Sequence, residues 1–163
     1  MSARSARGSL VCLLVLAACR PAARAAPADA PADAPGAAPI AALPPITLPP
    51  ELDRVLRDYE RDWRARSAQQ LSLQFTVDGF VLSDRRPPVR GRAAIAEAYT
   101  GRGGPLTLAA LAYATGDTVG YIVGTYGGAD PAAHGGKYLL ALRRTPGGPW
   151  LIAADMDNRS TRD

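Results

Sequence analysis

A chain of 163 residues has room for one ordinary folded domain. Its net charge of +4 raises the possibility of nucleic-acid binding, but four of its basic residues precede residue 51. From there onward fifteen basic residues face thirteen acidic ones, and they form no basic run. Because a nucleic-acid groove needs clustered basic side chains, often with stacking aromatics between them, we expect no nucleic-acid partner.

The first residues have the layout of a secretory signal. Arg4 and Arg7 precede a short apolar run, Leu10–Ala18, which is too short for a membrane-spanning helix of roughly 20 residues. The run ends in Leu16-Ala17-Ala18-Cys19, which resembles the lipobox of bacterial lipoproteins. We therefore predict a signal peptide over residues 1–18 and lipid modification of Cys19. The alternative is an ordinary signal peptide whose cleavage site includes a cysteine.

The predicted lipid anchor sets the expected location. Stable anchoring needs more than one acyl chain, and lipoproteins of this class carry several. Arg20 rather than an aspartate follows Cys19, which by analogy favours the periplasmic face of the outer membrane. Cys12 would leave with the signal, so the mature domain would hold neither a disulfide nor a free thiol.

Residues 19–48 are rich in alanine and proline and contain the imperfect repeat APADAPADAP. This composition favours extended geometry and offers few side chains large enough to pack, so we predict a disordered tether. The folded domain is then expected over residues 49–160.

Two helices are predicted at the start of this domain. Over residues 50 to 66, apolar side chains recur at helical spacing, so that they share one face. They are Leu52, Val55, Leu56, Tyr59 and Trp63. Ser67 is a predicted cap for a second, short helix that ends at Leu73 or Phe75. A strand over residues 79–83, a proline loop and a helix over residues 91–100 follow.

The periodicity changes after residue 105. Four strand-like runs of eight to ten residues, 106–115, 119–126, 137–144 and 150–157, are separated by glycine-rich turns. Helices followed by an antiparallel meander give an α+β layout with helices on one face of the sheet. Gly120 and Gly124 inside a strand indicate strong bending or close backbone approach. A curved sheet around a long helix forms a cone whose cavity is the default ligand site.

The ordered set of residues resembles the nuclear-transport-factor-2-like superfamily, in its SnoaL-like and ketosteroid isomerase homologue branch. The resemblance covers about residues 50 to 159. It rests on Tyr59, Trp63, Asp78-Gly79, Val89, Gly91-Arg92, Ile95, Gly116-Asp117, Gly124, Tyr126, Gly136-Lys137-Tyr138, Gly148, Trp150, Ile152 and Asp155. It implies a cystatin-like cone, with a curved antiparallel sheet wrapped around the long first helix. The superfamily contains both enzymes and non-catalytic domains, so the fold alone does not assign a function.

The isomerase that gives the branch its name uses a carboxylate base beside an oxyanion hole of a tyrosine and a protonated aspartate. By this resemblance the candidate catalytic residues are Tyr59, Asp78 and Asp155. The expected ligand-binding residues are Tyr59, Trp63, Tyr99, Tyr121 and Asp155. On simpler interpretations, Tyr59 and Trp63 are core residues of the helix and Asp78 shapes a turn.

Asp155 and Asp157 share one face of a regular strand, opposite Trp150, Ile152 and Met156. If the bulky set packs on the helices, the two acids point to solvent or to a partner, and this is the arrangement we expect. In the opposite orientation both carboxylates enter the cavity, and the pKa of one of them should rise.

No metal or cofactor is expected. His134 is the single histidine, and the domain lacks cysteine, so a zinc site or a histidine-dependent triad would depend on that one residue. The glycine-rich pieces join strand to strand, unlike a phosphate-binding loop. Arg85, Arg86, Arg90 and Arg92 cluster around the proline loop, either to meet an anionic ligand or as solvated side chains.

The sequence thus favours an exported, lipid-anchored domain that binds a small, largely apolar molecule without turnover. A homodimer through the exposed face of the sheet is also expected. The alternative is an enzyme of the isomerase, dehydratase or cyclase type that uses tyrosine and aspartate as acid and base.

Overall fold

The computed structural model describes residues 43–129 and 134–160, which form three helices and a single six-stranded sheet in that part of the chain. In chain order the elements are α1 (Pro50–Arg64), α2 (Ala68–Leu73), β1 (Phe75–Leu82), β2 (Val89–Arg90), α3 (Arg92–Tyr99), β3 (Thr107–Thr115), β4 (Val119–Gly127), β5 (His134–Arg143) and β6 (Leu151–Arg159). The predicted α+β class, a curved sheet packed against a long first helix, is confirmed.

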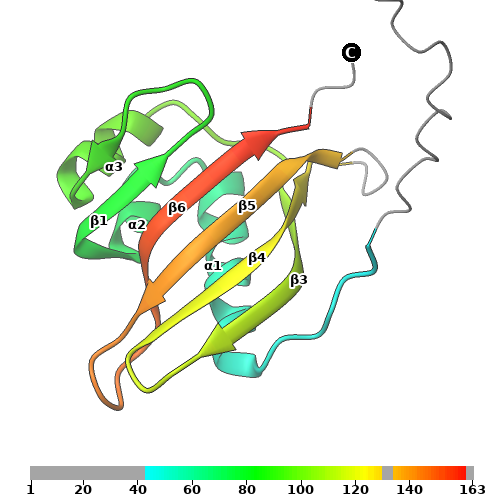
Figure 1. Ribbon diagram of the computed structural model, residues 1–163. Coiled ribbons are helices and arrows are strands. Elements are labelled where there is room, and N and C mark those ends of the chain that lie inside the picture. Colours follow the sequence, from blue (N-terminus) through cyan, green and yellow to red (C-terminus); the bar gives the residue numbers. More distant parts are fainter. Residues whose placement is uncertain (1–42, 130–133, 161–163) are drawn as a thin grey trace, which may run out of the picture. The chain divides into compact units, whose positions relative to one another are not determined.

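The strands lie in the order β2-β1-β6-β5-β4-β3 (Figure 1). From β3 to β6 they form the predicted antiparallel meander. The prediction of a wholly antiparallel sheet is wrong at one place, because β1 runs parallel to β6. Between β1 and β6 the chain forms β2, α3 and the strands β3 to β5, so it returns to β1 by a long crossover rather than a hairpin (Figure 1).

The first helix is amphipathic as predicted. Leu52, Val55, Leu56 and Tyr59 are buried against the sheet, and Pro50 occupies the first turn, where its missing N–H costs nothing. The helix ends at Arg64, two residues earlier than predicted, and Arg66 adopts a left-handed φ of 54°. Ser67 occupies the predicted N-cap position of α2, but its side chain makes no cap hydrogen bond there.

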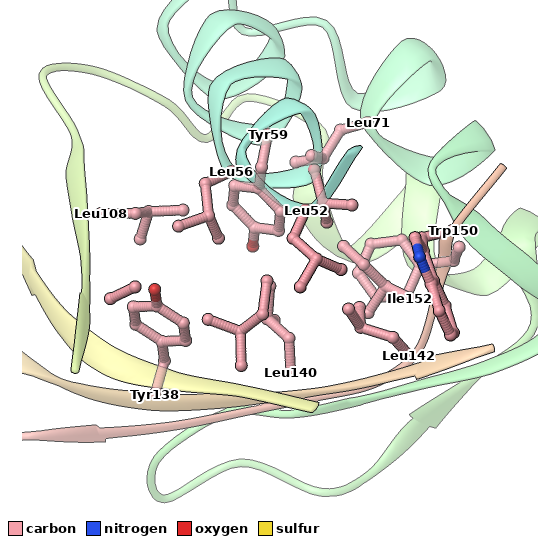
Figure 2. Close-up of a cluster of buried hydrophobic side chains, with 14 of the residues drawn as sticks. Leu52, Leu56, Tyr59, Leu71, Leu108, Tyr138, Leu140, Leu142, Trp150 and Ile152 are labelled. Carbon is pink, nitrogen blue, oxygen red and sulfur yellow. The ribbon is translucent and has the colours of Figure 1, made fainter. Parts of the chain in front are cut away.

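The core lies between α1 and the inner face of the sheet. In Figure 2, Leu52 and Leu56 of α1 point toward Leu140 and Leu142 of β5. Ile152 and Phe75, both fully buried, continue this core toward β1. The opposite face of the sheet exposes large apolar side chains, namely Val119, Tyr121, Leu139 and Met156.

The folded part begins before residue 49. Leu48 is buried in the core, and the backbone N–H of Ile46 donates a 2.8 Å hydrogen bond to the carbonyl of Ala110 in β3. In Figure 1 the segment before α1 accordingly runs beside β3. The described part of the tether therefore belongs to the domain from Ile46 onward.

Within residues 43–129 and 134–160, no helix combines the length and the apolar character that crossing a membrane requires. The predicted signal peptide and Cys19 lie outside the described residues.

Candidate functional site

A cavity of about 220 Å³ lies between α1, α3, the loop after β1 and the inner face of the sheet. Buried side chains form its closed end, and exposed or half-exposed side chains form its open side. Its lining consists of Tyr59, Trp63, Ser83, Asp84, Arg86, Tyr99, Arg102, Leu106, Leu108, Tyr126, Tyr138, Leu140, Asp155, Asp157 and Arg159. The lining combines apolar side chains with charged ones, whereas the sequence predicts a largely apolar ligand.

Three polar side chains from three elements meet at the closed end. The hydroxyl of Tyr59 on α1 donates a 2.9 Å hydrogen bond to Oδ2 of Asp155 on β6. The hydroxyl of Tyr99 on α3 lies 3.3 Å from the same oxygen and 3.1 Å from the hydroxyl of Tyr59. All three side chains are at least nine-tenths buried. The cavity therefore ends in a carboxyl group that accepts hydrogen bonds from tyrosine.

A bulge in β6 is what turns Asp155 inward. Ala154 pairs with Ala141 of β5, but Leu142 pairs with Ile152, so Ala153 is an extra residue. One extra residue reverses the side-chain alternation beyond it. Ile152 and Asp155 therefore both face the helices, which regular alternation does not allow. The expectation that the two acids face solvent is wrong: Asp155 is buried, Asp157 also lines the cavity, and Met156 is exposed in their place.

The surroundings of Asp155 shift its protonation. Burial disfavours the charged form and raises the pKa of Asp155 to about 6, while the hydrogen bond from Tyr59 opposes this shift. Burial and the nearby Asp155 carboxylate raise the pKa of Tyr59 and that of Tyr99 well above the usual range. Near neutral pH the tyrosines thus keep their protons, and Asp155 can exchange its own.

Aromatic rings line the walls beside this cluster. Trp63 stacks on Tyr59 with ring centroids 6.4 Å apart and meets Tyr99 edge to face at 5.6 Å. Tyr138 of β5, whose hydroxyl end faces the helices in Figure 2, lines the cavity on the sheet side. These packed rings hold the hydroxyl groups in fixed positions.

The open side of the cavity carries charges of both signs. Arg86 and Arg159 are exposed, and Arg102 is half-buried. Asp157 accepts a 3.0 Å hydrogen bond from the backbone N–H of Asp84, which ties the loop after β1 to β6.

Of the residues that the sequence suggested for the site, Tyr59, Trp63, Tyr99 and Asp155 line the cavity together. Asp78 lies apart from them: its side chain is exposed on β1 and forms an ion pair with Arg143. Tyr121 lies on the outer face of β4, where it pairs with Ala141, because its neighbour Ile122 takes the inward position. The enzyme hypothesis thus keeps Tyr59 and Asp155 in one cavity, whereas Asp78 does not line it.

Of the predicted arginine cluster, Arg86 alone lines the cavity. Arg90 lies over the ring of Phe80, and Arg92 donates to the carbonyl of Phe75. The sequence reasoning did not single out Tyr126 and Tyr138 as site residues, although both stood in the motifs that indicated the fold. Their alternation with buried neighbours on β4 and β5 could have placed them on the inner face. In the part of the chain that the structure describes, no group of acids, histidines or cysteines could hold a metal ion.

No protein-family model and no curated protein matches the sequence. Solved structures do match it. A ketosteroid isomerase-like protein from Erwinia carotovora atroseptica has a TM-score of 0.54 and 16% identity, over 68% of this chain and 94% of that one. An NTF2-like protein of unknown function from Shewanella oneidensis has a TM-score of 0.56 and 14% identity, over 66% of this chain and 95% of that one.

A domain of unknown function with a cystatin-like fold from Nostoc punctiforme also matches, with a TM-score of 0.55 and 14% identity, over 71% of this chain and 81% of that one. The chain thus has the cystatin-like fold of NTF2-like proteins, with a cavity that ends in a Tyr–Tyr–Asp cluster. At such identities the likeness extends to the fold alone.

Proposed function

We propose that this protein binds a small molecule in the cavity between α1, α3 and the sheet. The observation that carries the proposal is the buried Tyr59–Tyr99–Asp155 cluster at the closed end of a partly apolar hollow. Binding pockets pair an apolar wall with a few convergent polar groups in this way. A volume of about 220 Å³ is below the ~300–1,000 Å³ of drug-sized sites, so the ligand is small. Leu106, Leu108 and Leu140 favour a largely apolar body with one polar end.

A matched pair of variants tests this binding. Leu106 lines the cavity and is half-buried, so Leu106→Trp fills the hollow with little strain on the core. Leu111, also half-buried on β3, lies outside the lining, and Leu111→Trp is the control. Mass spectrometry should recover a co-purifying small molecule from the wild type and from the control but not from Leu106→Trp. Equal recovery from all three proteins would show that the cavity is not the binding site.

A second candidate is catalysis by the same cluster. The contact between Tyr59 and Asp155 favours it, because a carboxyl group with a pKa near 6 suits general acid–base chemistry near neutral pH. A panel of steroid, epoxide and polyketide substrates would then show turnover that falls about 10²- to 10⁴-fold in Asp155→Asn. Absence of turnover on the whole panel, or turnover that survives this substitution, leaves non-catalytic binding as the function.

We also propose that Cys19 anchors the protein to the periplasmic face of the outer membrane, on the strength of the lipobox-like sequence alone. Cell fractionation should find the wild type in the membrane fraction and Cys19→Ser in the soluble periplasm. If both proteins fractionate alike, the cysteine is not the anchor.

For the outer face of the sheet we propose a second copy of this chain as the partner. Tyr121, Leu139 and Met156 expose between 41% and 50% of their surface there, and a symmetric pair would bury them together. Sedimentation velocity should find a dimer for the wild type and a monomer for Leu139→Arg. A wild type that sediments as a monomer at high concentration refutes this pairing.

A further inference from the structure

We propose that the ligand of this cavity is a small protonated amine, whose nitrogen binds Asp155 at the closed end among the aromatic rings. The inference rests on the proposed binding function and names the chemical class of the ligand.

The first argument is that the carboxyl group of Asp155 lacks a cationic partner. It is 5% exposed, yet no lysine or arginine of the described residues forms an ion pair with it. A buried carboxylate is costly unless an opposite charge or several hydrogen bonds compensate it. Both hydrogen bonds to this carboxyl group reach Oδ2, so Oδ1 accepts none from the described residues. Since Asp155 lines the cavity, a ligand can supply the missing charge.

The second argument concerns hydrogen-bond donors. Tyr59 donates to Asp155, and Tyr99 donates either to Asp155 or to the hydroxyl oxygen of Tyr59. In both arrangements the two hydroxyl protons are used within the cluster. While Asp155 is ionised, the Tyr59–Tyr99–Asp155 cluster itself therefore offers acceptors and no free hydroxyl donor. A ligand carbonyl or carboxylate finds no donor in this cluster, whereas an ammonium group supplies the protons that the cluster lacks.

The third argument is the placement of rings and charges along the cavity. Tyr59, Trp63 and Tyr99 surround the inner part, and aromatic faces attract cations within about 6 Å. The arginines of the lining, Arg86, Arg102 and Arg159, are exposed or half-exposed and lie at the open side. Positive charge is thus kept from the closed end. A monoamine with a neutral or acidic outer end fits this distribution, and a diamine does not.

Three probes of nearly equal shape and different charge test the proposal on the full chain. They are 2-phenylethylamine, 2-phenylethanol and phenylacetate, and their affinities are measured by calorimetry at about pH 7.5. We expect the amine to bind at least about tenfold more tightly than the alcohol, because a charge-assisted hydrogen bond is stronger than a neutral one. Phenylacetate should bind most weakly of the three. An alcohol or an acid that binds as tightly as the amine overturns the inference.

The dependence on pH gives a readout that needs no variant. The titratable groups that share the cavity with Asp155 are Tyr59 from α1, Tyr99 from α3, Tyr126 from β4, Tyr138 from β5 and Asp157 from β6, together with Asp84, Arg86, Arg102 and Arg159. An alkylamine stays protonated over this range, whereas Asp155, whose pKa is raised to about 6, loses its charge in acid. The affinity of the protein for the amine should therefore fall about tenfold between pH 7.5 and pH 5. A ligand held by the protonated carboxyl group would instead bind better at pH 5, which would contradict the proposal.

The variant Asp155→Asn should lose the preference for the amine over 2-phenylethanol, and circular dichroism shows independently that the variant is folded. Asp78→Asn, which neutralises an exposed carboxylate outside the cavity, should keep the preference. If the alcohol binds without any preference for the amine, the inference fails and the proposed binding function stands. If none of the probes binds, the inference fails as well, and the Leu106→Trp comparison alone decides the binding function.

Discussion

At the scale of single residues, the balance between burial and hydrogen bonding around Asp155 decides what the cavity can do. Burial raises the pKa of its carboxyl group to about 6, and the hydroxyl groups of Tyr59 and Tyr99 limit the rise. Because the raised pKa means that the folded state binds this proton more tightly than the unfolded chain, Asp155 favours folding in acid. That contribution is complete below about pH 4 and is lost as the pH rises through 6.

The first prediction follows from the direction of this pKa shift. Asp155→Asn removes the cost of a buried charge, so the variant should gain stability relative to the wild type as the pH rises. The difference in unfolding free energy should change by about 2 kcal/mol between pH 4 and pH 7 in favour of the variant. Urea unfolding of both proteins at several pH values measures this difference. The contributions of the other carboxyl groups are the same in both proteins and cancel. A difference that stays constant with pH would contradict the raised pKa.

Part of the site was predictable at this scale, and part was not. Tyr59 lies on the regular apolar stripe of α1, so its inward direction follows from helical spacing. The direction of Asp155 does not follow from its sequence, because it depends on the extra residue Ala153 in β6. Nothing local marks that alanine as a bulge. Because the prediction assumed regular strand alternation, it placed Asp155 on the wrong face of the sheet.

At the scale of elements, α1 does more than present an apolar face. Glu60, one residue after Tyr59, is 2% exposed and accepts hydrogen bonds from Arg57 and Arg64 and a 2.7 Å bond from the backbone N–H of Leu108. Arg57 in turn donates to the carbonyl of Leu108. This pair of contacts fixes the start of β3 against the helix. It thereby sets the wall of the cavity that Leu108 forms.

The second prediction concerns this link. Glu60→Ala leaves the buried N–H of Leu108 and two arginines without their acceptor, and we expect a loss of about 3 kcal/mol in unfolding free energy. Asp53→Ala removes an exposed ion pair with the same Arg57 and should cost less than about 1 kcal/mol. Urea unfolding compares the two variants. Equal losses would mean that Glu60 acts only as a surface charge.

Most elements were predictable from periodicity, whereas their pairing was not. The four strand-like runs after residue 105 correspond to β3, β4, β5 and β6, because turn residues separate them clearly. The parallel pairing of β1 with β6 joins residues some seventy positions apart, and no local pattern encodes it. The two-residue strand β2 is too short to show any alternation. One feature of the strand pairing was predictable: a glycine inside a strand indicated close backbone approach, and Gly124 does lie close to the backbone of β3.

The third prediction uses that glycine. A Cβ atom at position 124 would collide with the carbonyl oxygen of Ala109 and lie 2.6 Å from the hydroxyl of Tyr138. Gly124→Ala should therefore force β3 away from β4 and cost about 3 kcal/mol or more. Gly128→Ala, where a Cβ atom meets nothing within 4 Å, is the control and should change stability little. Thermal unfolding decides between them, and a stable Gly124→Ala protein would refute the close contact.

At the scale of the whole molecule, the sheet separates two surfaces with different roles. Its inner face meets the helices and carries the core and the cavity, while its outer face exposes Tyr121, Leu139 and Met156. A ligand and a second copy of the chain could therefore bind at the same time without competing. The cavity opens beside the loop after β1, at Asp84 and Arg86, on the inner side of the sheet.

The last prediction concerns where the folded domain begins. The sequence placed the boundary at residue 49, because alanine and proline dominate before it. Leu48 is nevertheless buried, and the N–H of Ile46 bonds to Ala110, so this segment closes one end of the core. Leu48→Ala should cost about 2–4 kcal/mol, as other buried leucines do. Leu43→Ala, at a leucine that is 67% exposed, should stay within about 0.5 kcal/mol. Urea unfolding of the full chain measures both. If Leu48→Ala proves as mild as Leu43→Ala, the core ends at α1, and the segment before it is only a spacer.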